Sequence, residues 1–491
     1  MLSAFVNSLK IPDLRTRIFY TFWMIFLCRI LAAIPAPGVN RGALSEWFNR
    51  RADGGIASMF NMFTGGALEQ FAVAALGIMP YISASIILQL ATAVVPTLQK
   101  LQREGEVGKQ KITQYTRYLT LLLCLVQSYL LMNAFSNPQA LGLNEAIFQN
   151  TLGTRFLIVI TMTTAAMLLV WMGEQITDKG VGNGVSLIIT ISIISQLPQA
   201  IRTMWSMFTT KVNFPGWDSG PRGLLKYLVD LLLQNGDQPA VWSPFHLIAL
   251  LLFFFIVTAG TVMLTMGVRK VPVTHAKRVV GRKVYGGQNT HFPLRVNYAG
   301  VMPIIFAQAL LMFPQPFFQN VLFKKFEWQW AADVGSYFGM ETKTYMLVYI
   351  AMLMFFSFFW VATQFNPIQI ADQLKKDGGY IPGIRPGKST ADFLDRTMTR
   401  LTLAGAICLT FLAILPMILN SKFNIPFVVA QFFGGTSLLI IVGVMLDTMR
   451  QIESHLLNRH YDGFLRKGKG TGTQRKRKSK NPKSKKDTED N

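Results

Sequence analysis

Long apolar segments alternate with short polar ones along most of this chain. An α-helix needs ~20 mostly apolar residues to cross the hydrocarbon core of a bilayer. The pattern predicts ten membrane-spanning helices, at Ile18–Ile34, Leu76–Val95, Leu119–Ala134, Phe156–Met172, Val185–Ile201, Phe245–Val268, Ala299–Val321, Tyr345–Thr363, Leu401–Leu419 and Phe427–Met445. No small-residue cleavage site follows the first segment, so we expect a retained span there and not a removed signal peptide.

A shorter apolar element precedes the second span. The run GGIASMFNMFTGG (Gly54–Gly66) places five large apolar side chains between two glycine pairs, namely Ile56, Met59, Phe60, Met62 and Phe63. This element is too short to cross a bilayer. Because broken backbone at membrane depth survives only inside protein or beside water, the pattern predicts a pore that holds a small helix.

Positive charge is concentrated on every second connection between the spans. The chain has 48 Lys and Arg against 25 Asp and Glu, a net charge of +23, although only 15% of its residues are charged. The basic connections carry Lys100, Arg103, Lys109, Lys111 and Arg117; then Arg269, Lys270, Lys277, Arg278, Arg282, Lys283 and Arg295; then Lys375, Lys376, Arg385, Lys388 and Arg396. The positive-inside rule therefore predicts that these connections and both termini are cytoplasmic.

The spans divide evenly around one long connection. Five precede residues 202–243 and five follow, and an odd number in each half gives the two halves opposite orientations, as in inverted-repeat transporters. We therefore expect an N-terminal half (1–201), an external connection (202–243), a C-terminal half (244–449) and a basic tail (450–491). The predicted fold is an all-α integral membrane protein with ten transmembrane helices in two inverted, pseudo-symmetric five-helix halves, plus one short half-helix.

The span interiors contain almost no ionisable side chains. Ion-coupled transporters and pumps keep such groups near mid-membrane, whereas here Arg29 is the exception, and we expect it to snorkel or to pair with a backbone carbonyl. Cys28, Cys124 and Cys408 lie in apolar runs without metal-ligand spacing, which is typical of inert thiols. We predict no catalytic residue, no metal site and no cofactor. A pore lined by aliphatic groups would suit a chemically varied solute.

Two alternatives stay open on these patterns. A solute transporter built from inverted repeats predicts mid-span ligands and ion coupling. A membrane-embedded enzyme predicts a polar catalytic cluster at one membrane face, and the connection 366–396 does contain four aspartates among its basic residues, without metal spacing: Asp372, Asp377, Asp392 and Asp395.

Long motifs then resemble one family. They are FNMFTGGALEQ, ALGIMPYISASIILQL, EGEVGKQKITQYTRYLT, WMGEQITDKGVGNGVSLII, THFPLRVNYAGVMPIIFA, FNPIQIADQLKK, YIPGIRPGKSTADFLDRTMTRLTLAGA and FGGTSLLIIVGVMLDT. In this order, from about Ile11 to Met449, they resemble the bacterial SecY family, the pore subunits of the Sec protein-conducting channel. The resemblance implies a channel without catalytic residues that passes unfolded secretory polypeptides across the membrane and releases transmembrane segments sideways into lipid.

The resemblance also implies roles for individual residues. The half-helix Ile56–Gly66 corresponds to the family's plug. The family's pore ring falls on Ile78, Ile82, Ile189, Ile305, Ala309 and Ile440, of which Ala309 is smaller and predicts a looser collar at that point. The family opens sideways between spans two–three and seven–eight, and the polar groups expected at this lateral gate are Gln89, Gln127 and Asn297.

The basic connections 269–298 and 366–396 resemble the family's docking surfaces for the SecA motor or the ribosome, with Arg282, Lys283 and Arg385 as the candidate contacts. Energy would come from SecA, from the ribosome or from the membrane potential. The implied partners also include SecE, SecG, a precursor carrying a signal peptide and membrane lipids, and the implied location is the bacterial cytoplasmic (inner) membrane. The lysine-rich tail Arg466–Lys486 fits anionic lipid, ribosomal RNA or plain solvation equally well.

Overall fold

The computed structural model describes residues 11–39, 44, 56–136, 147–148, 151–209, 244–275, 278–280, 283–285, 289–311, 314, 318, 329–339, 342–423 and 425–470. Within these residues, eight helical segments are long and apolar enough to cross a membrane. They comprise α2 (Pro12–Ala33), α7 (Glu106–Phe135), α9 (Leu152–Lys179), α10 (Gly184–Ser195) with α11 (Leu197–Thr209), α13 (Pro244–Met266), α18 (Lys343–Gln364), α20 (Lys388–Phe423), and α21 (Phe427–Gly434) with α22 (Thr436–Gly470).

The two remaining predicted spans take special forms. The second consists of α5 (Met79–Val94) and α6 (Pro96–Arg103), which meet at a bend of 103°. Pro96 explains the bend, because a proline disfavours the helical conformation in the residue before it, and Val95 is extended with ψ 114°. The seventh corresponds to α14 (Met302–Leu311), a short apolar helix, and most of the sequence that follows it to Val321 lies outside the described residues.

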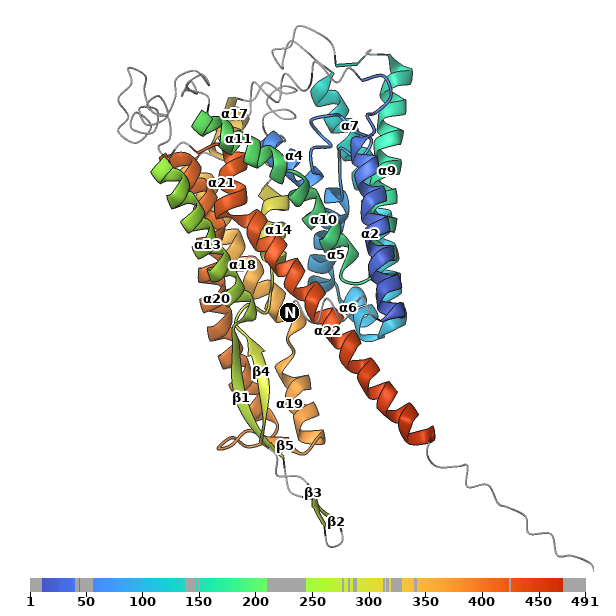
Figure 1. Cartoon of the computed structure of the whole chain (residues 1–491), viewed down its shortest axis with the longest axis vertical. Helices are drawn as coiled ribbons and strands as arrows, with labels where there is room; N and C mark the ends of the chain where they lie inside the picture. The colour runs from blue at the N-terminus through green and yellow to red at the C-terminus, as the bar shows by residue number, and fades with distance from the viewer. Residues whose placement is uncertain are drawn as a thin grey trace, which may run out of the picture.

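The helices form two groups with a central contact between them (Figure 1). In the first group α7 packs against both α5 and α9, while α2 and α10 pack against α9. In the second, α18 packs against α14 and α20, and α13 lies beside α20. The groups meet where α14 contacts α5 and where α22 crosses against α10. This arrangement places one buried apolar core at the junction of the groups.

A small β-structure extends beyond one end of the helices (Figure 1). Strand β1 (Val268–His275) pairs with β4 (Asn289–Arg295) and with β5 (Gly379–Tyr380), all antiparallel, in the order β4-β1-β5. A two-stranded ribbon of β2 (Arg278–Val280) and β3 (Lys283–Tyr285) continues past it, and α19 (Pro367–Lys376) lies alongside. Two connections that we predicted only as loops, 269–298 and 366–396, are therefore joined by one sheet.

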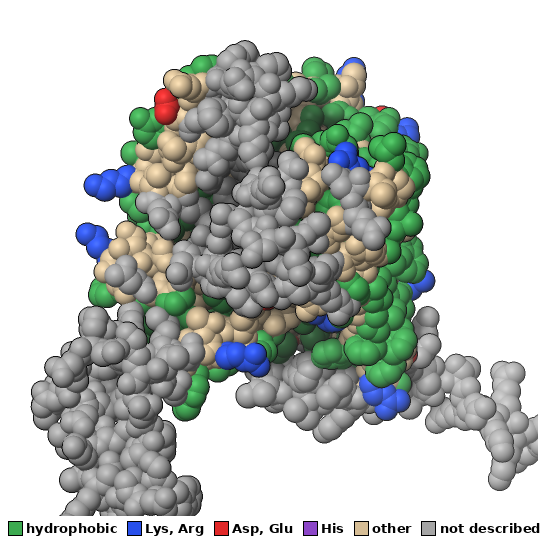
Figure 2. All heavy atoms as spheres, turned by 90° about the horizontal axis from the view of Figure 1, so that it is seen from above, with side chains coloured by type: hydrophobic (Ala, Val, Ile, Leu, Met, Phe, Trp, Pro, Cys, Tyr) green, Lys and Arg blue, Asp and Glu red, His purple; other side chains and the backbone are tan. Residues whose placement is uncertain are grey.

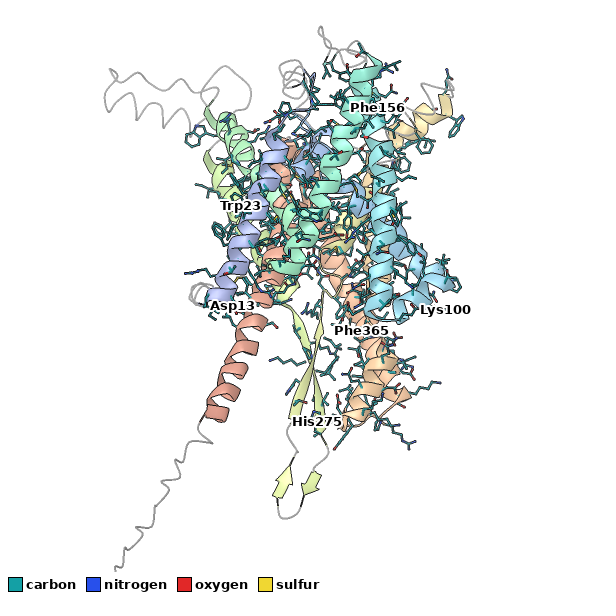
Figure 3. All side chains as sticks on the ribbon, turned by 90° about the vertical axis from the view of Figure 1, so that its right-hand side faces the viewer. Asp13, Trp23, Lys100, Phe156, His275 and Phe365 are labelled. Carbon is teal, nitrogen blue, oxygen red and sulfur yellow. The ribbon has the colours of Figure 1, made fainter. Side chains whose placement is uncertain are left out.

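The outer surface of the helices is apolar. On α2 the side chains of Phe19, Phe22 and Phe26 are more than half exposed, and in Figure 3 Trp23 points outward from the same helix. Viewed from above, hydrophobic side chains cover much of the outer wall (Figure 2). Exposed aromatic groups at this density are incompatible with water as the only solvent, so this surface faces lipid.

The basic connections lie at one end of the molecule. Lys100 on α6 and His275 at the end of β1 both lie toward the end where α2 begins at Asp13 (Figure 3), and α22 extends past that end (Figure 1). The short helices α4 (Ile56–Thr64) and α17 (Gln329–Tyr337) lie at the other end.

Candidate pore and plug

The six predicted pore-ring residues converge on one buried cluster. They come from four helices and the turn before α5, and each is at most 4% exposed: Ile78, Ile82, Ile189, Ile305, Ala309 and Ile440. Each helix is apolar over this stretch and carries β-branched side chains, so the packing holds the ring without a hydrogen bond. In a pore, a ring of such side chains excludes water and ions and presents no fixed polar ligand.

A cavity of about 670 Å³ lies beside the predicted pore ring, and three of the ring residues line it: Ile82, Ile189 and Ile305. Its lining combines apolar and polar side chains from α5, α7, α9, α10 and α14. The charged side chains in it are Glu106, Lys109, Arg117, Glu174 and Asp178. Helix α7 begins here beside the basic α6, which lies toward the end of the helices that carries the sheet (Figure 1). A cavity with charged groups in its wall thus reaches the apolar side chains of the predicted ring.

Helix α4 lies toward the end of the helices away from the sheet (Figure 1). Its side chains Met62 and Phe63 are 5% and 4% exposed and belong to the same cluster as the ring, and Phe60 packs against that cluster. The side chains of Ile56 and Met59, also predicted for this helix, lie outside the described residues. Helix α4 packs against α10, and Ser437 at the start of α22 donates a hydrogen bond of 3.3 Å to the Met62 sulfur. The half-helix predicted from the sequence is therefore present, and it packs into the cluster that holds the predicted ring residues.

Two glycines end this helix. Gly65 and Gly66 have φ of +69° and +86°, which side chains with a Cβ rarely adopt. The Gly65 amide donates to the Met62 carbonyl at 3.1 Å and the Gly66 amide to the Asn61 carbonyl at 2.9 Å. This is the Schellman pattern, which stops a helix within one residue.

Polar side chains approach the end of α4. The Arg29 guanidinium on α2 donates to the Gly65 carbonyl at 3.0 Å. The Ser195 hydroxyl on α10 shares its proton between the Ser192 carbonyl at 2.7 Å and the Gly65 carbonyl at 3.2 Å. The Asn61 side chain makes two hydrogen bonds with Glu69. Its oxygen accepts from the Glu69 backbone amide at 3.0 Å, and its NH2 group donates to the Glu69 carboxylate at 3.2 Å. The expected carbonyl pairing of Arg29 is thus confirmed, and its partner is the residue that follows α4.

The predicted gate amides do not bond across the gate. Gln89 donates to Ser85 on its own helix at 3.1 Å, and Asn297 donates to the carbonyl of Gly300 three residues on at 3.0 Å. Gln127 is half-buried on α7. Among the described residues, no hydrogen bond joins any two of these amides. Instead α5 contacts α14 directly, so the helices on the two sides of the predicted gate meet by packing.

Of the three predicted docking residues, the structure describes Arg385 in full and the backbone of Lys283. Arg385 is exposed in a turn between Gly383 and Gly387, whose φ are +82° and +105°, and its carbonyl accepts a hydrogen bond from Thr390 at 2.9 Å. Lys283 begins β3, but its side chain, like the whole of Arg282, lies outside the described residues. The structure therefore presents Arg385 to solvent on a fixed turn.

One pair of site residues was missed by the sequence analysis. Arg117 on α7 and Glu174 on α9 form two hydrogen bonds of 2.8 Å in the cavity wall. Both residues lie near the ends of apolar runs. The sequence analysis interpreted charges at such positions only as signals for the orientation of the spans in the membrane. Opposite charges at the same end of two neighbouring spans were the available signal.

Comparisons with known proteins agree with this geometry. The family model described as SecY matches residues 72–449. The Chlamydia muridarum protein translocase subunit SecY is 41% identical over 470 residues, which cover 93% of this chain and 97% of that one.

Two solved structures share the fold. One is a SecY channel whose plug domain is described as stabilising the closed state of the translocation channel and maintaining a membrane seal; it has a TM-score of 0.53 at 18% identity and covers 89% of this chain and 91% of its own. The other is the Sec61 chain of a canine ribosome–channel complex, with a TM-score of 0.50 at 17% identity and the same coverage. With the family model matched over most of its length and a relative 41% identical over 93% of it, this chain belongs to the SecY family.

Proposed function

We propose that this chain is the central pore subunit of a Sec translocon, through which unfolded secretory polypeptides cross the membrane. The observation that carries the proposal is the order of three features along one path, namely a polar cavity, an aliphatic collar and a short helix behind it. An aliphatic collar makes no hydrogen bond with a passing chain, so it tolerates any sequence while blocking ions when empty.

The same pore releases transmembrane segments sideways between α5–α7 and α14–α18. The direct contact of α5 with α14 supports this gate, because apolar contacts between helices have no large advantage over contacts with lipid. The half-buried amides Gln89 and Gln127 are available to an entering signal helix, and Asn297 marks the turn before α14.

The sheet and the Arg385 turn form the docking surface for the partner that supplies energy, either the SecA ATPase or the ribosome. The chain itself is a channel and carries no catalytic residue in this proposal. Arg385 supports it because an exposed guanidinium on a fixed turn binds RNA phosphates or carboxylates in a directed way. Arg282 and Lys283 belong to the same surface, and the ribosome-bound canine channel is a structural neighbour. SecE and SecG complete the complex.

The chain is a multi-pass membrane protein, and we place it in the bacterial cytoplasmic membrane with both termini inside. The collection of the basic connections at one end supports this orientation. The halves 1–201 and 244–449, related by inverted symmetry, stay part of the proposal.

The test is transport into vesicles. Purified channel with SecE and SecG, in vesicles supplied with SecA and ATP, should move an unfolded precursor with a signal peptide into a protease-protected space. The control is the same precursor without its signal peptide, which should stay outside. Uptake of a small solute in the absence of partner and precursor, with no precursor transport, would instead favour a transporter.

A further inference from the structure

Arg29 is an unusual residue for its position. It lies within the apolar helix α2, where a guanidinium keeps its charge because its proton is not lost in proteins. No carboxylate among the described residues pairs with it. A charge at such depth needs a partner, and the partner in the structure is the Gly65 carbonyl at 3.0 Å.

The Gly65 carbonyl is a suitable acceptor for a cation. It follows the last turn of α4, where carbonyls without intrahelical partners carry the negative end of the helix dipole. The Ser195 hydroxyl also lies 3.2 Å from this oxygen, although its nearer acceptor is the Ser192 carbonyl at 2.7 Å, so a second span approaches the same oxygen with a shared donor. A cavity of about 20 Å³, room for about one water molecule, lies beside this contact and is lined by Arg29, Thr64 and Ile78.

The chain on the other side of Gly65 is anchored. The backbone amide of Ala36 donates to the Phe71 carbonyl at 2.9 Å, and the amide of Val73 donates to the Ile34 carbonyl at 2.8 Å. The residues that follow the plug are therefore tied to the segment after α2, and the glycines Gly65 and Gly66 are the flexible joint before them. Glycine changes its φ and ψ at low cost, so this joint allows α4 to swing away from the collar.

From these contacts we propose that Arg29 is the positioning residue that latches the plug in the closed channel, by gripping the carbonyl at the joint about which α4 turns. This inference rests on the proposed role of α4 as the plug. Opening breaks the charged hydrogen bond of Arg29 and the weaker contact of Ser195 before α4 can leave. It also breaks the two hydrogen bonds between Asn61 and Glu69, which span the joint. The latch thereby sets how often the empty channel opens.

The experiment measures the position of α4 and the leak separately. All channels carry Cys28, Cys124 and Cys408 replaced by alanine, together with Met62→Cys and Ser437→Cys, two residues in contact at 3.3 Å. A short thiol-to-thiol cross-linker reports docked plugs, and ion flux through vesicles reports the leak, in the complete complex. Arg29→Met should increase the displaced fraction about tenfold or more, and Ser195→Ala a few-fold, since hydrogen bonds to charged groups are the stronger ones.

Arg450→Met is the matched control. Arg450 also donates to a backbone carbonyl, that of Thr265 at 3.4 Å, but it does so on α22, away from the plug. It should leave both readings unchanged. Arg29→Lys keeps a cationic donor and should release the plug less than Arg29→Met. If the Arg29→Met channel does not assemble, cross-linking and ion leak are measured in Ser195→Ala and Arg29→Lys instead.

The outcomes separate the latch from the plug itself. Lower cross-linking together with a higher leak in Arg29→Met supports both the latch and the role of α4 as the plug. Unchanged cross-linking in a correctly assembled Arg29→Met channel overturns the latch, whatever the role of α4. Lower cross-linking with an unchanged leak supports the latch and overturns the proposal that α4 seals the pore.

Discussion

Arg117 and Glu174 join α7 to α9 through a two-point ion pair, in which the Nε and Nη2 atoms each lie 2.8 Å from a carboxylate oxygen. Ser128 and Thr163, whose hydroxyl oxygens are 3.3 Å apart, connect the same two helices at another level. The polar contacts between spans in the first group thus bind α7 to its neighbour α9, while the seam between α5 and α14 is closed by packing. When the gate opens, α7 and α9 should move as one body.

The ion pair should contribute modestly to stability. Glu174→Gln should lower the apparent unfolding temperature in detergent by at most about 2 °C, because the Arg117 side chain is 48% exposed and solvent screens the pair. Glu106→Gln is the control: its pair with Lys109 is 3.3 Å long and far more exposed, so no change is expected. A double-mutant cycle with Arg117→Gln that shows no coupling would contradict the pairing.

The collar should determine the resting leak. Ile82→Gly combined with Ile305→Gly removes two ring side chains that are 4% and 3% exposed, so water and ions should enter the closed pore. We expect a several-fold rise in ion conductance across planar bilayers. The control is Ile87→Gly on the same helix α5, where the side chain is 45% exposed and glycine costs the helix about the same, ~1 kcal/mol. Equal conductance in both channels would remove these residues from the ring.

The joint at Gly65 should tolerate no side chain. In Gly65→Ala the added Cβ would lie 2.8 Å from the Ser195 hydroxyl and at a φ of +69° that costs roughly 1–2 kcal/mol, so the plug should dock less often. Gly105→Ala also adds a Cβ at a positive φ, +78°, but that Cβ meets nothing within 4 Å. The leak should therefore rise in the first variant and not in the second. A similar leak in both would show that the close approach of Arg29 and Ser195 to Gly65 is unimportant.

The Arg385 turn should matter for driven transport and little for assembly. Arg385→Glu should slow SecA- or ribosome-dependent translocation about tenfold or more, since it replaces a directed cation by a repelling anion on the docking surface. The amount of channel inserted in the membrane should stay the same. Lys388→Glu, an exposed charge reversal three residues away, is the comparison and should have a smaller effect. Parallel loss of transport and of inserted channel would indicate misfolding.

Local composition was enough to predict the spans that the structure describes, the half-helix between glycines and the scarcity of ionisable groups in the span interiors, with Arg29 as the exception. A bilayer requires every segment that crosses it to have a certain length and an apolar composition, so these features can be recognised from short stretches of sequence. The convergence of Ile82, Ile189 and Ile305 was available only through the family resemblance, since a single isoleucine in an apolar helix looks the same whether it faces lipid or a pore.

Which groups meet across the molecule depended on the packing of distant segments. The pairing of β1 with β5 joins connections about one hundred residues apart, and short strands in basic loops give only a weak alternating pattern. Arg29 was visible as a charge in need of a partner, but a backbone carbonyl has no sequence signature, so Gly65 was not predictable. Gln89 and Asn297 bond locally for the same reason: an amide takes the nearest partner the fold supplies, and only three-dimensional packing specifies that partner.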